Sequence, residues 1–95
     1  MVVGLCKVEL AIEWAFSLKA KRSVVRKVLG RVRNHFPVSA AEVEDQDIWN
    51  RAILGFAVIG SEHVQVNRTL NKLVDFIEGL GLGEVQGVEF EILHW

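Results

Sequence analysis

Two stretches of this 95-residue chain carry apolar residues at helical spacing, and alternating stretches flank them. The first helical stretch has its apolar positions at Leu18, Val25, Leu29, Val32 and Phe36. The second has them at Val66, Leu70, Leu73, Val74 and Ile77. Apolar residues three or four apart form one face of a helix, whereas alternation places them on one face of a strand. The order of these periods predicts strand, helix, strand, strand, helix, strand.

Each helical stretch is flanked by residues that typically begin or end a helix. Ser17 can accept a hydrogen bond from a free helical N–H, and Pro37 disfavours helical geometry in the residue before it. Ser61 can cap the second helix in the same way, and a glycine cluster at Gly79, Gly81 and Gly83 can end it. The sequence therefore predicts helices near residues 18–35 and 62–79.

Four alternating or apolar stretches predict strands, at residues 2–13, 38–44, 52–59 and 88–92. Right-handed crossovers then place both helices on one face of the sheet. We expect a single α+β domain over residues 1–95. It would be a ferredoxin-like βαββαβ two-layer sandwich with a four-stranded antiparallel sheet. A less regular α+β sandwich is the alternative.

Charge is balanced overall but segregated along the chain. The net charge is −1, and the segment between Trp14 and Ala41 holds seven cations and no acid. At about 100° per residue, four of these cations share one side of the first helix, over about 21 Å. They are Lys19, Arg22, Arg26 and Arg33, and with Lys21 they are the candidate nucleic-acid-binding residues. The alternative is a solvated helix face, or cations that pair with acids elsewhere in the fold.

The open face of the sheet predicts a different role. Six acids are expected to point away from the helices: Glu9, Glu13, Glu42, Glu44, Glu89 and Glu91. No aromatic residue clearly shares that face, so we do not expect RNA bases to stack there. Four residues are the candidate interface at its centre: Leu5, Ile53, Ala57 and Ile59. An apolar patch ringed by acids favours a homodimer or a protein partner, although scattered exposed aliphatic residues are also common.

Two segments carry a family resemblance. They are SLKAKR at residues 17–22 and VSAAEVEDQDIW at residues 38–49, which continues through Arg51 to Gly55. The chain resembles the YlxP-like family of small bacterial proteins, whose usual acidic residue at the helix start is Ala20 here. The resemblance implies a ferredoxin-like fold and no particular activity. Family genes often neighbour those for ribosome-binding factor A and a translation initiation factor, which implies association with RNA or the ribosome.

The second segment is the hallmark of that resemblance. It makes Gln46, Asp47, Trp49 and Arg51 a secondary candidate site. Its four clustered acids could hold a hard cation such as Mg²⁺, but they match no EF-hand loop. A charged strand end, followed by a capped turn, is the simpler interpretation.

No catalytic constellation is visible in the remaining polar residues. His35, His63 and His94 lack ligand spacing, and Cys6 falls on the core face of its strand. We therefore expect no enzyme, no metal and no cofactor. A lone cysteine suits the cytoplasm, we expect no secretory signal, and no apolar run is long enough to span a membrane.

These observations lead to ranked hypotheses. The first is a non-enzymatic binding protein that contacts RNA or a ribosomal subunit through its basic first helix. The second is a homodimeric protein-interaction module that uses the sheet face. A small enzyme with a metal or phosphate substrate is the third.

Overall fold

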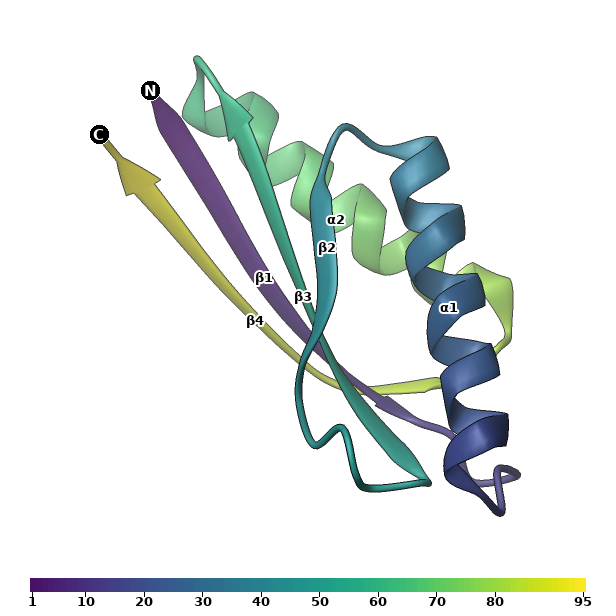
Figure 1. Cartoon of the computed structure of the whole chain (residues 1–95). Helices are drawn as coiled ribbons and strands as arrows, with labels where there is room; N and C mark the ends of the chain where they lie inside the picture. Colours follow the sequence, from purple (N-terminus) through teal and green to yellow (C-terminus); the bar gives the residue numbers. More distant parts are fainter.

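The computed structural model describes all 95 residues and confirms the predicted element order. The elements are β1 (Val2–Ala11), α1 (Leu18–His35), β2 (Ser39–Glu44), β3 (Arg51–Gly60), α2 (His63–Leu80) and β4 (Glu84–His94). The strands form one sheet in the order β2-β3-β1-β4, in which every neighbouring pair is antiparallel. Both helices lie on the same side of the sheet, so its other face is uncovered (Figure 1). The fold is the expected ferredoxin-like sandwich.

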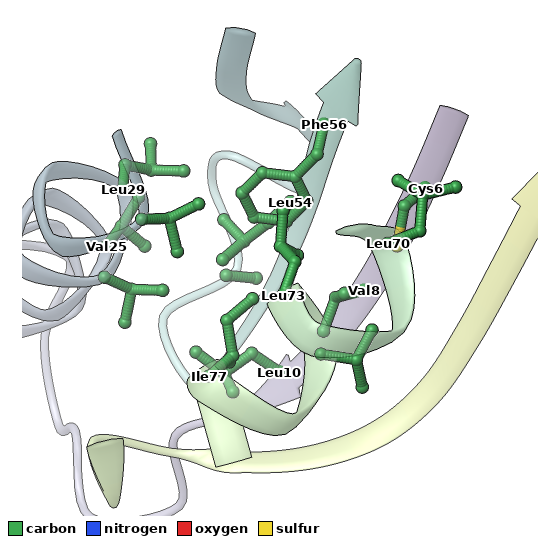
Figure 2. Close-up of a cluster of buried hydrophobic side chains, with 14 of the residues drawn as sticks. Cys6, Val8, Leu10, Val25, Leu29, Leu54, Phe56, Leu70, Leu73 and Ile77 are labelled. Carbon is green, nitrogen blue, oxygen red and sulfur yellow. The ribbon is translucent and has the colours of Figure 1, made fainter. Parts of the chain in front are cut away.

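The core lies between this sheet and the two helices. Cys6, Val8 and Leu10 of β1 point toward the helices and are buried (Figure 2). Leu54 and Phe56 of β3 pack beside them, and the apolar stripes of α1 and α2 close the layer. Burying each large aliphatic or aromatic side chain contributes about 1.5–3 kcal/mol. The helical and alternating periods therefore meet in one continuous core.

The connection between β1 and α1 begins earlier than predicted. β1 ends at Ala11, and the Ala15 N–H donates to the Ile12 carbonyl across a turn at 3.0 Å. The Ser17 hydroxyl then accepts from the Ala20 N–H at 3.1 Å, which confirms the predicted cap of α1. Ile12 and Ala15 are both fully buried, so this short connection is held against the core.

The ends of α2 confirm one predicted cap and correct the other. Glu62, not Ser61, is the N-cap residue, and its side chain makes no capping hydrogen bond. At the other end Gly81 adopts the left-handed conformation with φ of 66°. Neither helix is long and apolar enough to cross a membrane.

The side chains of β2 do not point to the faces of the sheet that the sequence predicts. Ala40 and Glu42 pair with Phe56 and Leu54, whose side chains point toward the helices. A register shift between Glu42 and Glu44 then turns Glu44 to the open face. A bulge inserts one extra residue and reverses the side-chain alternation beyond it. Glu42 therefore points toward α1, whereas the sequence predicts it on the open face.

Candidate nucleic-acid interface

α1 presents cations on its exposed side and no acid in its first turn. Five of these cations are exposed and make no ion pair: Lys19, Arg22, Arg26, Lys27 and Arg31. We call these five residues the basic face. The predicted alternative, in which acids elsewhere in the fold neutralise them, does not apply to these five side chains. Their charges are available to a ligand.

Lys21 does not belong to the basic face, which corrects the prediction. Its side chain is fully buried, and its Nζ lies 2.8 Å from Oε2 of Glu42. The same ammonium donates to the backbone carbonyl of Asp45 at 2.6 Å and is 3.4 Å from that of Gln46. An ammonium has three protons to donate, and three oxygen atoms already surround this one. Lys21 therefore holds the fold together and is not free to meet a phosphate.

Arg33 is only partly available. It is exposed, but its guanidinium donates a hydrogen bond to the backbone carbonyl of Ala40. β2 is an edge strand, and its unpaired backbone groups need partners or solvent. Arg33 thus covers one carbonyl of this strand. Of the predicted stripe, Lys19, Arg22 and Arg26 remain free of such contacts.

The signature segment, which we define as residues 42–51, wraps around the Lys21 ammonium. Asp45 adopts a positive φ of 58°, and its carboxylate lies 3.0 Å from Nε of Arg51. The Ile48 N–H donates to the Asp45 carbonyl at 3.0 Å and closes a turn. The acids Glu42 and Asp45 are thereby each engaged by a cation. These contacts give the segment a structural role around Lys21. No group of three or more potential metal ligands gathers in it or elsewhere.

Trp49 of the signature segment lies against Phe16, which the sequence does not single out. The two ring centroids are 6.2 Å apart, and the ring planes are inclined by 32°. Phe16 is 83 % exposed and Trp49 is 43 % exposed. Gln46 and Asp47 are exposed in the same loop, and Arg51 is held by Asp45. The secondary candidate residues therefore gather at the N-terminal end of α1, beside an exposed aromatic pair. The sequence offered one signal for this aromatic pair: Phe16 stands directly before the cap residue Ser17, and no helical or strand pattern explains it.

The open sheet face carries the four candidate interface residues together. Leu5 pairs with Ala57, and Ile53 and Ile59 alternate onto the same face of β3. Leu5, Gly55 and Ala57 contribute to a shallow groove of about 500 Å³, and Val43 overlies Gly55 within it. Glu89 and Glu91 of β4 border this groove. Other acids on this face include Glu9 and Glu44, whereas its one central cation, Lys7, pairs with Glu44 at 3.2 Å. The face is apolar at its centre and acidic at its rim.

Cys6, His63 and His94 are further side chains that could carry chemistry. Cys6 is buried, and this burial raises the pKa of its thiol to about 12, so the thiolate that a nucleophile requires does not form near neutral pH. His63 and His94, which the sequence treats as unrelated, stack with Nδ1 and Nε2 2.9 Å apart.

Comparisons with known proteins place the sequence among uncharacterised relatives. Residues 3–91 match the model of a family described as "Protein of unknown function (DUF503)". The uncharacterized protein YlxP of Bacillus subtilis (strain 168) is 39 % identical over 77 residues, which cover 81 % of this chain and 84 % of that protein.

Solved structures show the same fold at low sequence identity. A de novo designed ferredoxin-fold protein, LFR1 1, superposes with a TM-score of 0.58 at 12 % identity, over 98 % of this chain and 84 % of that one. LarC2, the C-terminal domain of a cyclometallase involved in synthesis of the lactate racemase cofactor, gives 0.50 at 15 % identity, over 98 % and 55 % of the two chains. These likenesses concern the fold alone. The family match and the identity to YlxP together show that this chain belongs to the DUF503, or YlxP-like, family.

Proposed function

We propose that this protein is a non-enzymatic binding protein that associates with RNA, free or within a ribosomal subunit, through the basic face of α1. The observation that carries this proposal is the set of five exposed cations without an acidic partner. Lysine and arginine side chains that neutralise phosphates release condensed counterions and supply most of the affinity of non-specific RNA binding. The lone, buried Cys6 is compatible with a reducing compartment, so we place this activity in the cytoplasm.

The distribution of acids supports the same surface. Acids of β1, β2 and β4 lie on the open sheet face, which is the side opposite the helices: Glu9, Glu44, Glu84, Glu89 and Glu91. A polyanion is repelled from that side and attracted to the basic face. The near-zero net charge of −1 therefore does not argue against RNA binding, because the two signs are separated in space.

The test is RNA binding across a salt series with charge-reversed variants. If Lys19, Arg22 and Arg26 each neutralise one phosphate, the log–log salt slope for single-stranded RNA is about −2. Arg22→Glu with Arg26→Glu should reduce affinity about tenfold or more and flatten this slope. It should do so for many RNA sequences alike, because phosphate contacts do not specify sequence.

The matched control lies on the other helix. Arg68 and Lys72 of α2 are exposed, unpaired and four residues apart, like Arg22 and Arg26. Arg68→Glu with Lys72→Glu makes the same change in net charge and should leave RNA binding nearly unchanged. Equal losses in the two double variants would show a general charge effect and would remove α1 from the mechanism. Thermal melts verify that each variant is folded.

A second candidate function rests on the groove of the open sheet face. Its apolar centre and acidic rim fit a protein interface, either between two copies of this chain or with another protein. This function does not compete for α1, so one protein can perform both. Association through this face should not weaken as salt rises, whereas RNA binding should.

A further inference from the structure

We infer that Phe16 and Trp49 form a stacking platform for an unpaired base, so that the RNA bound by this protein is single-stranded at the N-terminal end of α1. This inference rests on the proposed function and adds the class of nucleic acid. It begins from the two exposed rings, 83 % and 43 % exposed, whose centroids are 6.2 Å apart. Aromatic pairs usually lie 4.5–7 Å apart. Here the pair forms on the surface instead of in the core.

The fold holds both rings in place. Phe16 lies between Ala15, which is fully buried, and Ser17, which caps α1. Trp49 lies in the signature segment, which the buried ammonium of Lys21 anchors through the carbonyls of Asp45 and Gln46. The ion pair of Arg51 with Asp45 closes the same loop. A ring whose backbone is already ordered loses less conformational entropy when a ligand binds.

The platform is adjacent to the basic face along the chain. Lys19 follows Phe16 by three residues, and Arg22 follows Lys19 by about one turn of α1. Single-stranded nucleic acids are typically bound by aromatic rings that stack on bases, beside cations that contact the backbone. The exposed acids Glu13 and Asp47 lie within three residues of Phe16 and Trp49 in the sequence, so the phosphates are expected along α1, away from these acids.

The rings select the class of RNA. In a duplex each base face is covered by its neighbours, so a side-chain ring can stack only on an unpaired or terminal base. Stacking also tolerates every base, because each one has a flat π face. The platform therefore predicts a preference for single strands or loops over duplexes, with weak sequence preference. The open sheet face, where many small RNA-binding sandwiches stack bases, plays no part in this.

The experiment compares two probes: a labelled single-stranded RNA of about twelve mixed-sequence nucleotides, and the duplex of the same sequence. Phe16→Ala should weaken single-strand binding about fivefold or more, because stacking contributes about 1–3 kcal/mol per base. Its duplex affinity and salt slope should stay unchanged, since the phosphate contacts remain. Phe16→Trp should retain binding, whereas Phe16→Leu, which is apolar but has no π face, should behave like Phe16→Ala.

The outcomes separate this inference from the proposed function. If Arg22→Glu with Arg26→Glu abolishes binding while Phe16→Ala binds both probes like the parent, α1 binds RNA and the platform is wrong. If Phe16→Leu binds like the parent, the ring is only an apolar contact, and the stacking role is likewise wrong. A parent protein that binds neither probe overturns both proposals. Phe16 is largely solvent-exposed, so we expect all three variants to melt like the parent.

Discussion

Lys21 is the residue that most clearly organises the molecule. Among the charged side chains it alone is completely buried, and it pairs with Glu42, whose side chain is 16 % exposed. A buried ion pair often contributes little net stability compared with apolar residues of the same shape, but removal of one partner leaves the other charge uncompensated. The two carbonyls that face the ammonium would also lose a donor. The pair of Lys21 and Glu42 therefore adds little net stability, whereas the loss of Lys21 alone strongly destabilises the fold.

We expect Lys21→Met to lower the free energy of unfolding by about 3 kcal/mol, at the lower end of what breaking a buried pair costs. Lys19→Met, an exposed neighbour, should change it by about 0.5 kcal/mol or less. Urea denaturation measures both. The double variant Lys21→Met with Glu42→Gln should recover part of the loss, because no charge is then left unpaired. A Lys21→Met protein as stable as the Lys19→Met control would contradict this role for the pair.

The burial of Lys21 could have been predicted, but its partner could not. Lys21 precedes Val25 by four residues and Val28 by seven, so it lies on the buried side of a helix. The local clustering of cations suggested a basic surface instead. Glu42 is distant in sequence, and it reaches Lys21 because it alternates with Ala40 onto the helix side of β2, ahead of the bulge that turns Glu44 to the open face. Unbroken alternation places Glu42 and Glu44 on one face, so the sequence predicts both on the open face and cannot show the bulge that separates them.

At the scale of elements, the end of α2 is set by a single backbone conformation. Gly81 has a φ of 66°, which a side chain disfavours, and its amide contacts the Glu78 carbonyl at 3.4 Å. A Cβ placed on Gly81 would meet no atom within 4 Å. Any cost of substitution there is therefore backbone strain and not a clash.

Gly81→Ala should destabilise the protein by about 1 kcal/mol or slightly more, as expected for a left-handed residue that gains a Cβ. Gly79 provides the control, because it lies within α2 and a Cβ there also meets nothing within 4 Å. Gly79→Ala should stabilise the protein by about 0.5–1 kcal/mol, since alanine has the higher helix propensity. Thermal or urea unfolding gives both values. Two changes of the same sign would contradict the assignment of Gly81 as the cap.

At the scale of the whole molecule, the two layers separate the charges. The helical layer carries the basic face, and the outer face of the sheet carries acids around an apolar groove. Electrostatic potentials of opposite sign on opposite faces direct different ligands to different sides. Under the proposed function, the two faces would be used by different ligands, a polyanion on the helical side and a protein partner on the sheet side.

The homodimer hypothesis is tested at the centre of the sheet face. Ala57 has uncharged cross-strand neighbours, Leu5 and Ser39, so Ala57→Glu adds a charge without placing it directly opposite another acid. If the face joins two copies, Ala57→Glu should yield a folded monomer by sedimentation. Val64→Glu, at an exposed apolar site on α2, should leave the dimer intact. A parent protein that is monomeric at micromolar concentration rules the dimer out and leaves a different protein as the partner of this face.

The sequence by itself determined the element order, both helices, the cap at Ser17 and the acids along β4, because these follow from local periodicity and local hydrogen bonding. It also determined that α1 would be basic. Only the tertiary structure decided which cations are free, because pairing depends on distance in space: Lys21 is buried against Glu42, and Arg33 covers an edge-strand carbonyl. Only the tertiary structure brought Phe16 to Trp49, because a loop anchored from another element sets that contact.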